Sequence, residues 1–493
     1  MRVRPRETPR WELAKIADLF GSTATGEAVV TGIALNTAHV VTGDLYAALP
    51  GANVHGASFV GQARDQGAVA VLTDAAGAGD ARQVLPTVVV DDPRAGLAAL
   101  SAAFYGHPSE SFTTLGVTGT QGKTTATYLA EAALGDHVSA VVGTIGTRIG
   151  KIPAASTLTT PEAPQLQALF AVMREEAVEV CAMEVSSHAL VQGRVDGFTF
   201  DVAVFLNLGR DHLDFHRDLE DYFLAKAALF TPERAGHAVI NIDDAHGRRL
   251  RELTPLPVTT FSTDGNAADW RAVNIRPHRL GTDLEVLGPG GVAVDLSVPL
   301  PGVFNVSNAL AVISALVTAG HDPTELAAGI AASTGVPGRM ERVDAGQQFT
   351  AIVDYAHKPD AVTAVLTALR PVTAGRLIVV IGAGGDRDHG KRPLMGQASA
   401  RHADIVIVTD DNPRTERAAS IRRAVMEGAA AGPGVAIEVP GRREAIAHAV
   451  AMAHLGDTVV VAGKGHERGQ EVDGVVHPFD DREVLVELIG GLA

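Results

Sequence analysis

Short hydrophobic runs alternate with amphipathic, helix-like stretches along this chain. The runs are typical of buried strands, and the stretches between them repeat apolar residues at helical spacing. Such alternation predicts an α/β protein with mostly parallel sheets. In sheets of this kind, ligands bind at the carboxyl ends of the strands. We therefore expect the functional residues in the loops that follow the strands.

Two breaks in this pattern predict three domains. The first is Gly106-His107-Pro108-Ser109, which ends a small α/β unit of residues 1–107. The second lies around Gly335 and Pro337, and it separates a central domain of residues 108–338 from a doubly wound domain of residues 339–493. In the last two domains we expect strands at 138–142, 179–185, 202–206, 238–242, 349–353, 377–381, 404–408 and 458–461, and helices at 305–319 and 324–333.

Composition narrows the class of protein. Of the 493 residues, 46% are apolar and 20% charged, as in soluble globular proteins, and no apolar run is long enough to span a membrane. The single cysteine, Cys181, cannot form an internal disulfide, so we expect a buried thiol and a cytoplasmic location. The net charge of −16 disfavours nucleic-acid binding, because neutralising phosphates needs a basic face. Anionic ligands must instead meet local groups of Lys and Arg.

A glycine-rich turn at residues 116–125 is the clearest functional motif. An apolar run leads into Gly-Thr-Gln-Gly-Lys-Thr-Thr, whose glycines let backbone N–H groups converge on an anion. Lys123 offers a positive charge to the outer phosphates, Thr124 offers a hydroxyl to Mg²⁺, and a helix is expected to begin at about Lys123. Five residues separate Gly116 from Gly122 and two separate Gly119 from it, so the motif is a variant P-loop. The alternative is a tight turn that binds nothing.

Three other places in the central domain carry candidate chemistry. Glu184 ends an apolar run, where it could hold the Mg²⁺ of ATP, unless it is an exposed carboxylate at a sheet edge. The loop at 207–216 holds two Asp and two His, which suit either a metal or an ordinary turn. Lys226 lies in an apolar helical stretch, so it either extends to the surface or is a partly buried, reactive amine with a depressed pKa.

Two arginine-bearing loops follow strands in the third domain. The first contains Gly382-Ala383-Gly384, but the sixth position of the dinucleotide pattern Gly-x-Gly-x-x-Gly is Arg387, so we reject a dinucleotide site. The second, Asp411-Asn412-Pro413-Arg414, places an acid, an amide and a guanidinium together. These groups could bind both the ammonium and the carboxylate of an amino acid. The alternative is a capped turn before the helix expected at Arg417.

Several motifs, in order along the chain, carry a family resemblance. They are Gly119-Thr120-Gln121-Gly122-Lys123-Thr124, Met183-Glu184-Val185-Ser186-Ser187-His188, Asp211-His212-Leu213-Asp214, Ala225-Lys226, Phe304-Asn305-Val306-Ser307-Asn308-Ala309, Gly338-Arg339-Met340-Glu341 and Asp354-Tyr355-Ala356-His357. Over nearly the whole chain, the sequence resembles the ATP-dependent Mur ligases of bacterial cell-wall synthesis. The tetrapeptide at 411–414 is similar to the one that distinguishes diaminopimelate-adding members from lysine-adding ones.

The resemblance implies an N-terminal domain for a UDP-sugar, a central P-loop-type ATPase domain and a C-terminal Rossmann-like domain for an amino acid. The residues that would bind ATP are Gly119, Thr120, Gln121, Gly122, Lys123, Thr124, Thr125, Asn305, Arg339, Asp354 and His357. Those that would bind the UDP-muramoyl dipeptide are Leu35, Thr37, Thr159, Thr160, Ser186, Gln192 and Arg194. Those that would bind diaminopimelate are Arg387, Asp411, Asn412, Pro413, Arg414, Gly463 and Glu467. The catalytic residues would be Lys123, Glu184, His212 and Lys226, with Mg²⁺ held by Thr124, Glu184, His212 and a carbamylated Lys226.

The implied reaction joins diaminopimelate to the D-Glu γ-carboxylate of UDP-N-acetylmuramoyl-L-Ala-D-Glu through an acyl phosphate made from ATP. These small molecules would be the partners of the protein, and we expect a monomer that binds no nucleic acid and does not insert into a membrane. One motif departs from the family. Where Asp-Ser-Arg usually precedes Gly-Asp-Leu-Phe, this chain has Leu35-Asn36-Thr37-Ala38 before Gly43-Asp44-Leu45-Tyr46.

Three alternative functions share parts of this pattern. A lysine-adding Mur ligase and a folylpolyglutamate synthase would both keep the ATP loop, but the motif at 411–414 argues against them. A non-catalytic nucleotide-binding or scaffold protein would keep the fold without the metal and amine sites. The presence of Glu184, Lys226 and Arg414 argues against that class.

Overall fold

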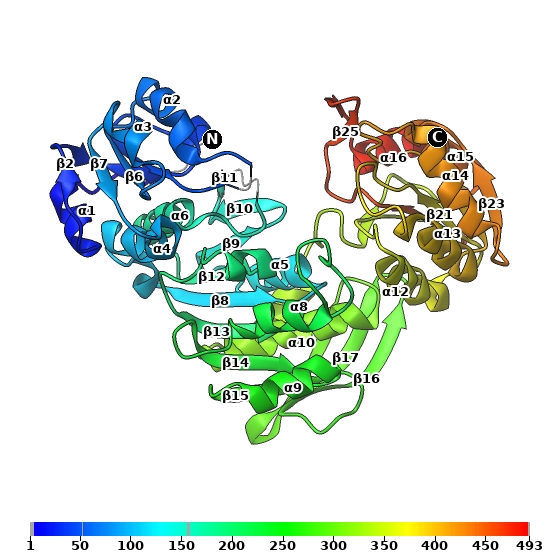
Figure 1. The fold of residues 1–493 in the computed structure, drawn as a ribbon. Helices are drawn as coiled ribbons and strands as arrows, with labels where there is room; N and C mark the ends of the chain where they lie inside the picture. The colour runs from blue at the N-terminus through cyan, green and yellow to red at the C-terminus, as the bar shows by residue number, and fades with distance from the viewer. Residues whose placement is uncertain (1–3, 52, 155–157, 492–493) are drawn as a thin grey trace. The chain divides into compact units, whose positions relative to one another are not determined.

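The computed structural model describes residues 4–51, 53–154 and 158–491 (Figure 1). The chain folds into two compact units. Unit 1 comprises Met1–Arg271, Gly288–Gly290 and Leu310–Gly329. Unit 2 comprises Ala272–Leu287, Gly291–Ala309 and Ile330–Ala493. The three domains expected from the sequence remain a prediction, and we describe the two units separately.

The amino-terminal part of unit 1 is a small sheet covered by helices. Its strand order is β2-β7-β6-β5-β4, in which β4 to β7 are parallel and β2 is antiparallel to β7. Alternate residues of the strands enter two separate hydrophobic clusters, one of which also takes in buried alanines of α6. The bounds are α1 (Leu13–Leu19), β2 (Ala24–Thr25), β4 (Gly32–Ala34), β5 (Asp44–Ala48), α2 (Val60–Asp65), β6 (Ala70–Thr73), α3 (Ala78–Arg82), β7 (Thr87–Val89), α4 (Pro93–Phe104) and α6 (Ala163–Glu175).

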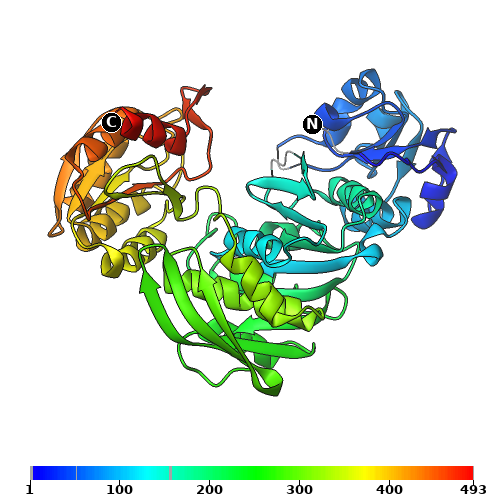
Figure 2. The same cartoon turned by 180° about the vertical axis from the view of Figure 1, so that it is seen from behind.

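The central sheet has the order β11-β10-β9-β12-β8-β13-β14-β15-β16-β17-β18 (Figures 1 and 2). Strands β9, β12, β8, β13, β14 and β15 are parallel, as the alternating pattern predicted. The bounds are β8 (Thr113–Thr118), α5 (Lys123–Ala133), β9 (Ser139–Gly143), β12 (Val180–Glu184), α7 (Ser187–Val191), β13 (Phe200–Phe205), α8 (Leu219–Ala227), β14 (Ala235–Asn241), α9 (Ala245–Leu253), β15 (Val258–Ser262), β16 (Trp270–His278), β17 (Gly281–Gly288), β18 (Val292–Val298), α10 (Val303–Thr318) and α11 (Pro323–Ala331).

An antiparallel hairpin follows β9 and was not expected from the sequence. Its strands are β10 (Gly146–Ile149) and β11 (Ile152–Ala154), and β10 also pairs antiparallel with β9. The two strands are too short and too polar to give a clear alternating pattern, which is why the sequence did not reveal them. They extend the sheet past its parallel part.

The carboxyl-terminal part of unit 2 is a second, doubly wound sheet of order β19-β20-β24-β21-β22-β23. All its strands are parallel except β19, and an antiparallel hairpin of β25 and β26 follows β24. The bounds are β19 (Glu341–Val343), β20 (Thr350–Asp354), α12 (Pro359–Leu369), β21 (Leu377–Ile381), α13 (Lys391–His402), β22 (Ile405–Val408), α14 (Ala418–Ala429), β23 (Val435–Glu438), α15 (Arg442–Met452), β24 (Thr458–Ala462), β25 (Gly469–Val472), β26 (Val475–Pro478) and α16 (Asp481–Gly490).

Local chemistry explains where several helices begin. Asp92 accepts hydrogen bonds from the N–H groups of Arg94 and Ala95 at the start of α4, and Pro93 occupies the first helical position. Asp218 caps α8 in the same way by accepting from the N–H of Asp221 at 2.8 Å. The Asp218 cap thus fixes the start of the helix that follows the loop at 207–216.

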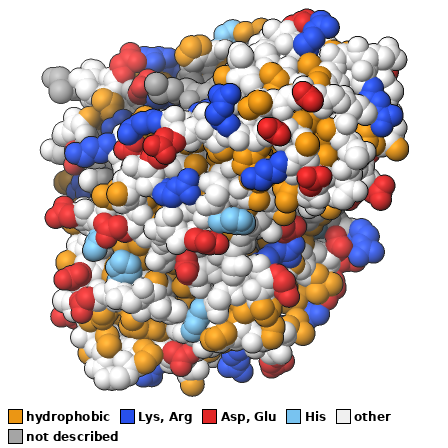
Figure 3. Space-filling model, turned by 90° about the vertical axis from the view of Figure 1, so that its left-hand side faces the viewer, with side chains coloured by type: hydrophobic (Ala, Val, Ile, Leu, Met, Phe, Trp, Pro, Cys, Tyr) orange, Lys and Arg blue, Asp and Glu red, His pale blue; other side chains and the backbone are white. Residues whose placement is uncertain are grey.

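The surface and interior agree with the composition. Cys181 is free and buried, as predicted, and burial raises the pKa of its thiol to about 12. On the face shown in Figure 3, basic side chains are mixed with acidic ones, so that face offers no continuous basic surface. Among the residues that the structure describes, no helix is both long enough and apolar enough to cross a membrane.

Candidate active site

Three neighbouring strands of unit 1 end together and carry the main functional loops. In the register of the sheet, Glu184 on β12 lies opposite Val117 on β8, and Phe205 on β13 lies opposite Thr118. The glycine-rich loop follows β8, the loop at 207–216 follows β13, and Glu184 ends β12. The expectation that these residues gather at the carboxyl edge of a parallel sheet is therefore confirmed.

The glycine-rich loop has the backbone that its sequence requires. Gly122 caps α5 with a φ of +88°, in the left-handed region that favours glycine. A Cβ on Gly119 would lie 3.0 Å from Cβ of Leu206, so a side chain there would press on the next strand. The helix α5 begins at Lys123, as expected, and it directs its amino-terminal N–H groups at the loop.

Asn207 holds the glycine-rich loop from the neighbouring strand. Its Oδ1 accepts a hydrogen bond from the N–H of Gln121 at 3.0 Å, and its Nδ2 donates to the carbonyl of Gln121 at 3.2 Å. The N–H of Thr120 also donates to the carbonyl of Asn207 at 3.0 Å. No sequence motif indicates this role of Asn207, because its partner Gln121 is in a different part of the chain.

Lys226 is buried beneath the same loop. It is 1% exposed, its Nζ donates to the carbonyl of Gly119 at 3.0 Å, and it lies 4.7 Å from the centre of the Tyr222 ring. The interpretation that Lys226 extends to the surface is therefore wrong, because the helix directs the side chain inwards. Nζ of Lys123 donates to the same carbonyl at 2.7 Å, so two amine groups converge on one oxygen.

Glu184 is a buried carboxylate whose two oxygens both accept hydrogen bonds. It is 1% exposed, so the alternative of an exposed edge carboxylate is wrong. Its Oε1 accepts from the N–H of Thr144 at 2.8 Å, and its Oε2 accepts from Oγ1 of Thr144 at 3.1 Å. A Cβ on Gly143 would lie only 2.2 Å from Oε1, so the carboxylate occupies space that a glycine leaves open.

The loop after β13 contains a group of aromatic and histidine rings. The His212 ring lies 4.9 Å from that of His188 and 5.9 Å from that of Tyr222, and His188 stacks on Phe215 at 4.0 Å. Burial lowers the pKa of His188, so this imidazole favours its neutral form. Within the described part of the chain, no group of three or more His, Cys, Asp or Glu side chains is arranged to hold a metal ion. A Mg²⁺ contact at His212 stays a prediction.

Most of the residues expected to bind the UDP-sugar dipeptide surround the end of β12. Oγ1 of Thr160 donates to the carbonyl of Glu184 at 2.8 Å, and Nη1 of Arg194 donates to the carbonyl of Thr160 at 2.9 Å. Oε1 of Gln192 accepts from Nη2 of Arg194 at 2.6 Å. Nearby, Oγ1 of Thr159 lies 3.0 Å from Oγ1 of Thr144, and Ser186 caps α7. Leu35 and Thr37 lie in the segment directly after β4, which is a strand of the other sheet of unit 1.

In unit 2, Asp354 ends β20 and is buried. Its two oxygens accept hydrogen bonds from the N–H groups of Met340 and Ala356, both at 2.7 Å. Burial raises the pKa of Asp354, and the positive charge of Arg339 opposes that shift. The Arg339 guanidinium itself lies 4.3 Å from the centre of the Tyr355 ring. Asp354 therefore fixes the segment that presents Arg339.

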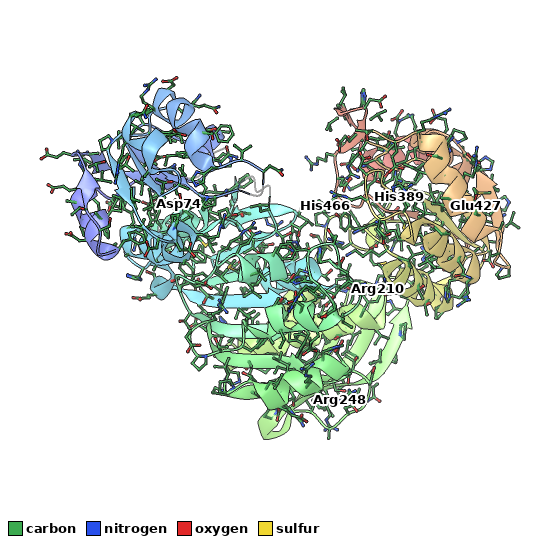
Figure 4. All side chains as sticks on the ribbon, viewed as in Figure 1. Asp74, Arg210, Arg248, His389, Glu427 and His466 are labelled. Atoms are coloured by element: carbon green, nitrogen blue, oxygen red, sulfur yellow. The ribbon has the colours of Figure 1, made fainter. Side chains whose placement is uncertain are left out.

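Two histidines near this segment are held neutral. Burial lowers the pKa of His357 to about 4, and burial also lowers the pKa of His466 to about 4. His466 lies in the loop after β24 (Figure 4), with its ring 5.2 Å from that of Tyr355. Asn305 is also expected to bind ATP, and it lies outside the glycine-rich loop. Its Nδ2 donates a hydrogen bond to the nearby carbonyl of Pro301 at 2.9 Å.

A buried network joins the two loops expected to bind the amino acid. Nδ2 of Asn412 donates to Oε2 of Glu467 at 2.9 Å, while Nζ of Lys464 donates to Oδ1 of Asn412 and to Oε2 of Glu467, both at 2.9 Å. Lys464 is 0% exposed, and the sequence analysis missed it. Its position between two glycines in the loop after β24 was the signal that could have revealed it. A Cβ on Gly463 would lie 2.7 Å from Oδ2 of Asp411, which explains why a glycine occupies this position.

Arg414 and Arg387 lie in the two arginine-bearing loops of unit 2. Nη1 of Arg414 donates to the carbonyl of Gly385 at 2.6 Å, so the loop after β21 contacts the loop after β22. Arg387 is exposed. The structure thus brings the 411–414 motif together with Gly463 and Glu467, and it leaves Arg387 accessible to a ligand.

Comparison with protein families identifies the chain. Family models match three successive segments: the Mur ligase family catalytic domain at residues 29–105, the Mur ligase middle domain at 117–316, and the Mur ligase glutamate ligase domain at 338–465. The chain belongs to the Mur ligase family. The glycine-rich loop, Glu184 and Lys226 all lie in the segment matched by the middle domain of this family.

Full-length relatives within the Mur ligase family carry a specific name. The protein named UDP-N-acetylmuramoyl-L-alanyl-D-glutamate–2,6-diaminopimelate ligase of Streptomyces coelicolor is 54% identical, and the match covers 99% of this chain and 97% of that protein. The protein of the same name from Corynebacterium glutamicum is 50% identical, with 93% of this chain and 92% of that protein covered.

Solved structures of Mur ligases have the same fold. A structure described as UDP-N-acetylmuramoyl-L-alanyl-D-glutamate–2,6-diaminopimelate ligase matches with a TM-score of 0.67 and 35% identity, over 94% of this chain and 95% of that one. The MurF ligase of Thermotoga maritima in complex with ADP matches with a TM-score of 0.61 over 93% and 96% of the two chains. Its identity is 19%, so that likeness shows the fold alone. The predicted α/β, multi-domain Mur ligase fold is therefore confirmed.

Proposed function

We propose that this protein is an ATP-dependent ligase that adds 2,6-diaminopimelate to the D-Glu γ-carboxylate of UDP-N-acetylmuramoyl-L-Ala-D-Glu in peptidoglycan synthesis. The observation that carries the proposal is the identity of 50–54% to relatives named for this reaction, over nearly the whole length of both proteins. The structure supports it with a phosphate-binding loop in unit 1 and a network of acid, amide and arginine side chains in unit 2.

The reaction needs activation because a carboxylate is a poor acylating agent. An oxygen of the D-Glu γ-carboxylate attacks the γ-phosphorus of ATP, ADP leaves, and an acyl phosphate forms. The amine of diaminopimelate then attacks the acyl carbon, an amide bond forms, and inorganic phosphate leaves as the amine loses its proton. Both steps bring negative groups together, so catalysis depends on positioning and on positive charge.

Lys123 and the backbone of the glycine-rich loop are placed to neutralise the transferred phosphoryl group. Nζ of Lys123 contacts the carbonyl of Gly119 in the loop, within reach of a phosphate bound there. Mg²⁺ bound with ATP supplies further charge neutralisation. The hydroxyl of Thr124 and the carboxylate of Glu184 fit this ion, because Mg²⁺ prefers oxygen ligands and both groups lie at the carboxyl edge of the sheet.

We also propose that Lys226 is carbamylated in the active enzyme. Two amines, those of Lys226 and Lys123, donate to one carbonyl oxygen, which is unfavourable when both carry a charge. Addition of CO₂ to the neutral Lys226 amine forms a carbamate and releases a proton, so that an anionic oxygen ligand takes the place of the amine. We expect a carbamate signal in ¹³C NMR after exposure to ¹³CO₂. A Lys226→Met variant that kept the signal would contradict the assignment.

A lysine-adding specificity is the second candidate for the same fold. Lysine lacks the second carboxylate of diaminopimelate, so it has no partner for an arginine placed to bind that group. The Arg414 guanidinium, held by Gly385 and accessible on one side, favours diaminopimelate. We further propose that the enzyme acts in the cytoplasm as a monomer, since its substrates are nucleotide-linked or small metabolites.

The proposed function is tested by phosphate release from purified protein with ATP and UDP-muramoyl dipeptide. The amino acid is varied among the diaminopimelate isomers, L-lysine and L-glutamate. We expect release with a diaminopimelate isomer and little with the others. Equal or greater release with L-lysine would reject the proposed specificity, and no release with any amino acid would reject the ligase assignment.

A further inference from the structure

The hairpin of β25 and β26 contacts three of the four residues of the 411–414 motif. Nε2 of Gln470 donates to the carbonyl of Asp411 at 2.6 Å, and the N–H of Glu471 donates to Oδ1 of Asn412 at 3.0 Å. The N–H of Arg414 donates to the carbonyl of Glu471 at 3.0 Å. The hairpin thus adds a strand-like edge to a loop that has no regular structure of its own.

Arg414 depends on the hairpin for its backbone conformation. Its φ is +53°, in the left-handed region that non-glycine residues adopt only when their surroundings hold them there. The N–H of Arg414 donates to the carbonyl of Glu471, and the carbonyl of Arg414 accepts a hydrogen bond from the N–H of Asp473 at 2.7 Å. Both backbone groups of Arg414 are therefore bound by the hairpin.

Glu471 also orients the Arg414 side chain. Oε2 of Glu471 accepts from Nε of Arg414 at 3.2 Å, while Nη1 of Arg414 donates to the carbonyl of Gly385. Nη2 makes no hydrogen bond to any residue that the structure describes. Each terminal nitrogen of the guanidinium consequently keeps at least one N–H group for a ligand, and the two lie side by side at its end. Such a pair binds a carboxylate through two parallel hydrogen bonds.

The hairpin has little else to hold it in place. Val475 and Val476 on β26 are 56% and 67% exposed, so the hairpin buries few apolar side chains at its tip. A two-stranded hairpin is marginally stable by itself. The order of the hairpin therefore depends strongly on its hydrogen bonds to the 411–414 loop.

We propose that the β25–β26 hairpin positions the amino-acid site and that Glu471 is a positioning residue, which fixes the Arg414 guanidinium so that its end binds a substrate carboxylate. The inference rests on the proposed function, because it assigns the bound carboxylate to diaminopimelate. Glu471 acts through Arg414 and does not contact the substrate. The charge of Glu471 is then less important than its ability to accept a hydrogen bond from Nε.

The test compares Glu471→Ala and Glu471→Gln in the full-length enzyme, with Glu487→Ala as control. Glu487 is an exposed carboxylate of the same unit that pairs with Arg443 on the surface. We expect Glu471→Ala to raise the KM for diaminopimelate roughly tenfold, which is the effect of losing one charge-assisted hydrogen bond. We expect the KM for ATP to stay unchanged. Glu471→Gln keeps an acceptor oxygen, so we expect it to stay within about threefold of the wild type.

Two results would overturn the inference. An unchanged KM for diaminopimelate in Glu471→Ala shows that the hairpin does not position the site. A Glu471→Gln variant as impaired as Glu471→Ala shows that the carboxylate charge acts on the substrate directly. Failure of the proposed function is distinguishable, because the wild-type enzyme would then release no phosphate with diaminopimelate.

Hydrogen exchange gives a readout that does not depend on the substrate. If the hairpin holds the loop, Glu471→Ala accelerates exchange at the amide of Arg414, and Glu487→Ala leaves it unchanged. Equal exchange at this amide in the wild type and in Glu471→Ala would also overturn the inference. The measurement additionally shows whether each variant is folded.

Discussion

At the scale of single residues, Gly143 illustrates how a missing side chain shapes the site. It ends β9 beside the Glu184 carboxylate, and the space that its hydrogen atom leaves is filled by Oε1. The carboxylate then reaches both donors of Thr144. An added methyl group would displace an acid that the proposed mechanism needs in one place.

The first prediction concerns Gly143→Ala. The new Cβ would lie 2.2 Å from Oε1 of Glu184, so the carboxylate has to move. Because small misplacements at a catalytic site are costly, we expect the rate of phosphate release to fall by roughly 10- to 100-fold. Gly61→Ala is the control, since a Cβ there meets nothing within 4 Å. A Gly143→Ala enzyme with full activity would contradict the role of this glycine.

The second prediction concerns the two neutral histidines of unit 2. His357 and His466 have folded-state pKa values of about 4, below the usual 6.5, because burial disfavours their charged forms. Between these pH values the unfolded chain binds protons that the folded protein does not. The contribution of each histidine to stability is therefore complete above pH 6.5 and is lost as the pH falls towards 4.

Chemical denaturation at a series of pH values measures this effect. We expect the double variant His357→Gln, His466→Gln to lose less stability than the wild type between pH 6.5 and 4. His448→Gln changes an exposed histidine of the same unit and is expected to keep the wild-type slope. Parallel slopes for all three proteins would show that the buried imidazoles do not titrate in this way.

At the scale of elements, the strands β12, β8 and β13 act together. Each contributes a different part of the proposed ATP site at the same edge of the sheet, and the loop after β13 supports the loop after β8 through Asn207. The glycine-rich loop is further joined to the loop after β13 through Oγ1 of Thr120, which accepts a hydrogen bond from the N–H of Gly209 at 2.9 Å. Its conformation therefore depends on the neighbouring element.

The third prediction follows from this support. Asn207→Ala removes both side-chain hydrogen bonds to Gln121 and loosens the loop. We expect the KM for ATP to rise roughly tenfold, as for the loss of one or two hydrogen bonds, with the KM for diaminopimelate unchanged. Asn266→Ala is the control, because that amide contacts Asp243 in a different loop of unit 1. An equal rise in both KM values would indicate general damage to the protein.

At the scale of the whole molecule, the residues proposed to bind phosphate and those proposed to bind the amino acid lie in different units. The proposed phosphate-binding residues around Lys123 belong to unit 1, and the proposed amino-acid residues around Arg414 belong to unit 2. The reaction nevertheless requires both substrates to meet.

The fourth prediction tests this requirement by mixing two inactive variants. Lys123→Ala removes the charge for the phosphates, and Arg414→Ala removes the carboxylate partner. If each chain supplies both parts of its own site, we expect the equimolar mixture to remain as inactive as the separate proteins. Recovery of activity on mixing would show that two chains share a site, and it would overturn the expectation of a monomer. Co-expressed wild type serves as the positive control.

The sequence by itself determined the α/β class, the candidate residues of the glycine-rich loop and the strands β9, β12, β13, β14, β20, β21, β22 and β24. These features depend on local patterns: apolar runs make buried strands such as Leu377–Ile381, and glycines at fixed spacing make the glycine-rich turn. The family resemblance added residues such as Thr160 and Asn305, and the family itself is confirmed. The roles of the individual site residues stay predictions.

Only the tertiary structure decided how those residues are supported. Lys226 contacts the carbonyl of Gly119 across 107 positions of sequence, and Glu471 contacts Arg414 across 57. No local pattern specifies such pairs, because they arise when strands and loops from distant segments meet at one edge of a sheet. The burial of Glu184 could be suspected from the sequence, because this residue ends an apolar run. The positioning role of the β25–β26 hairpin could not, because it depends on contacts between distant segments.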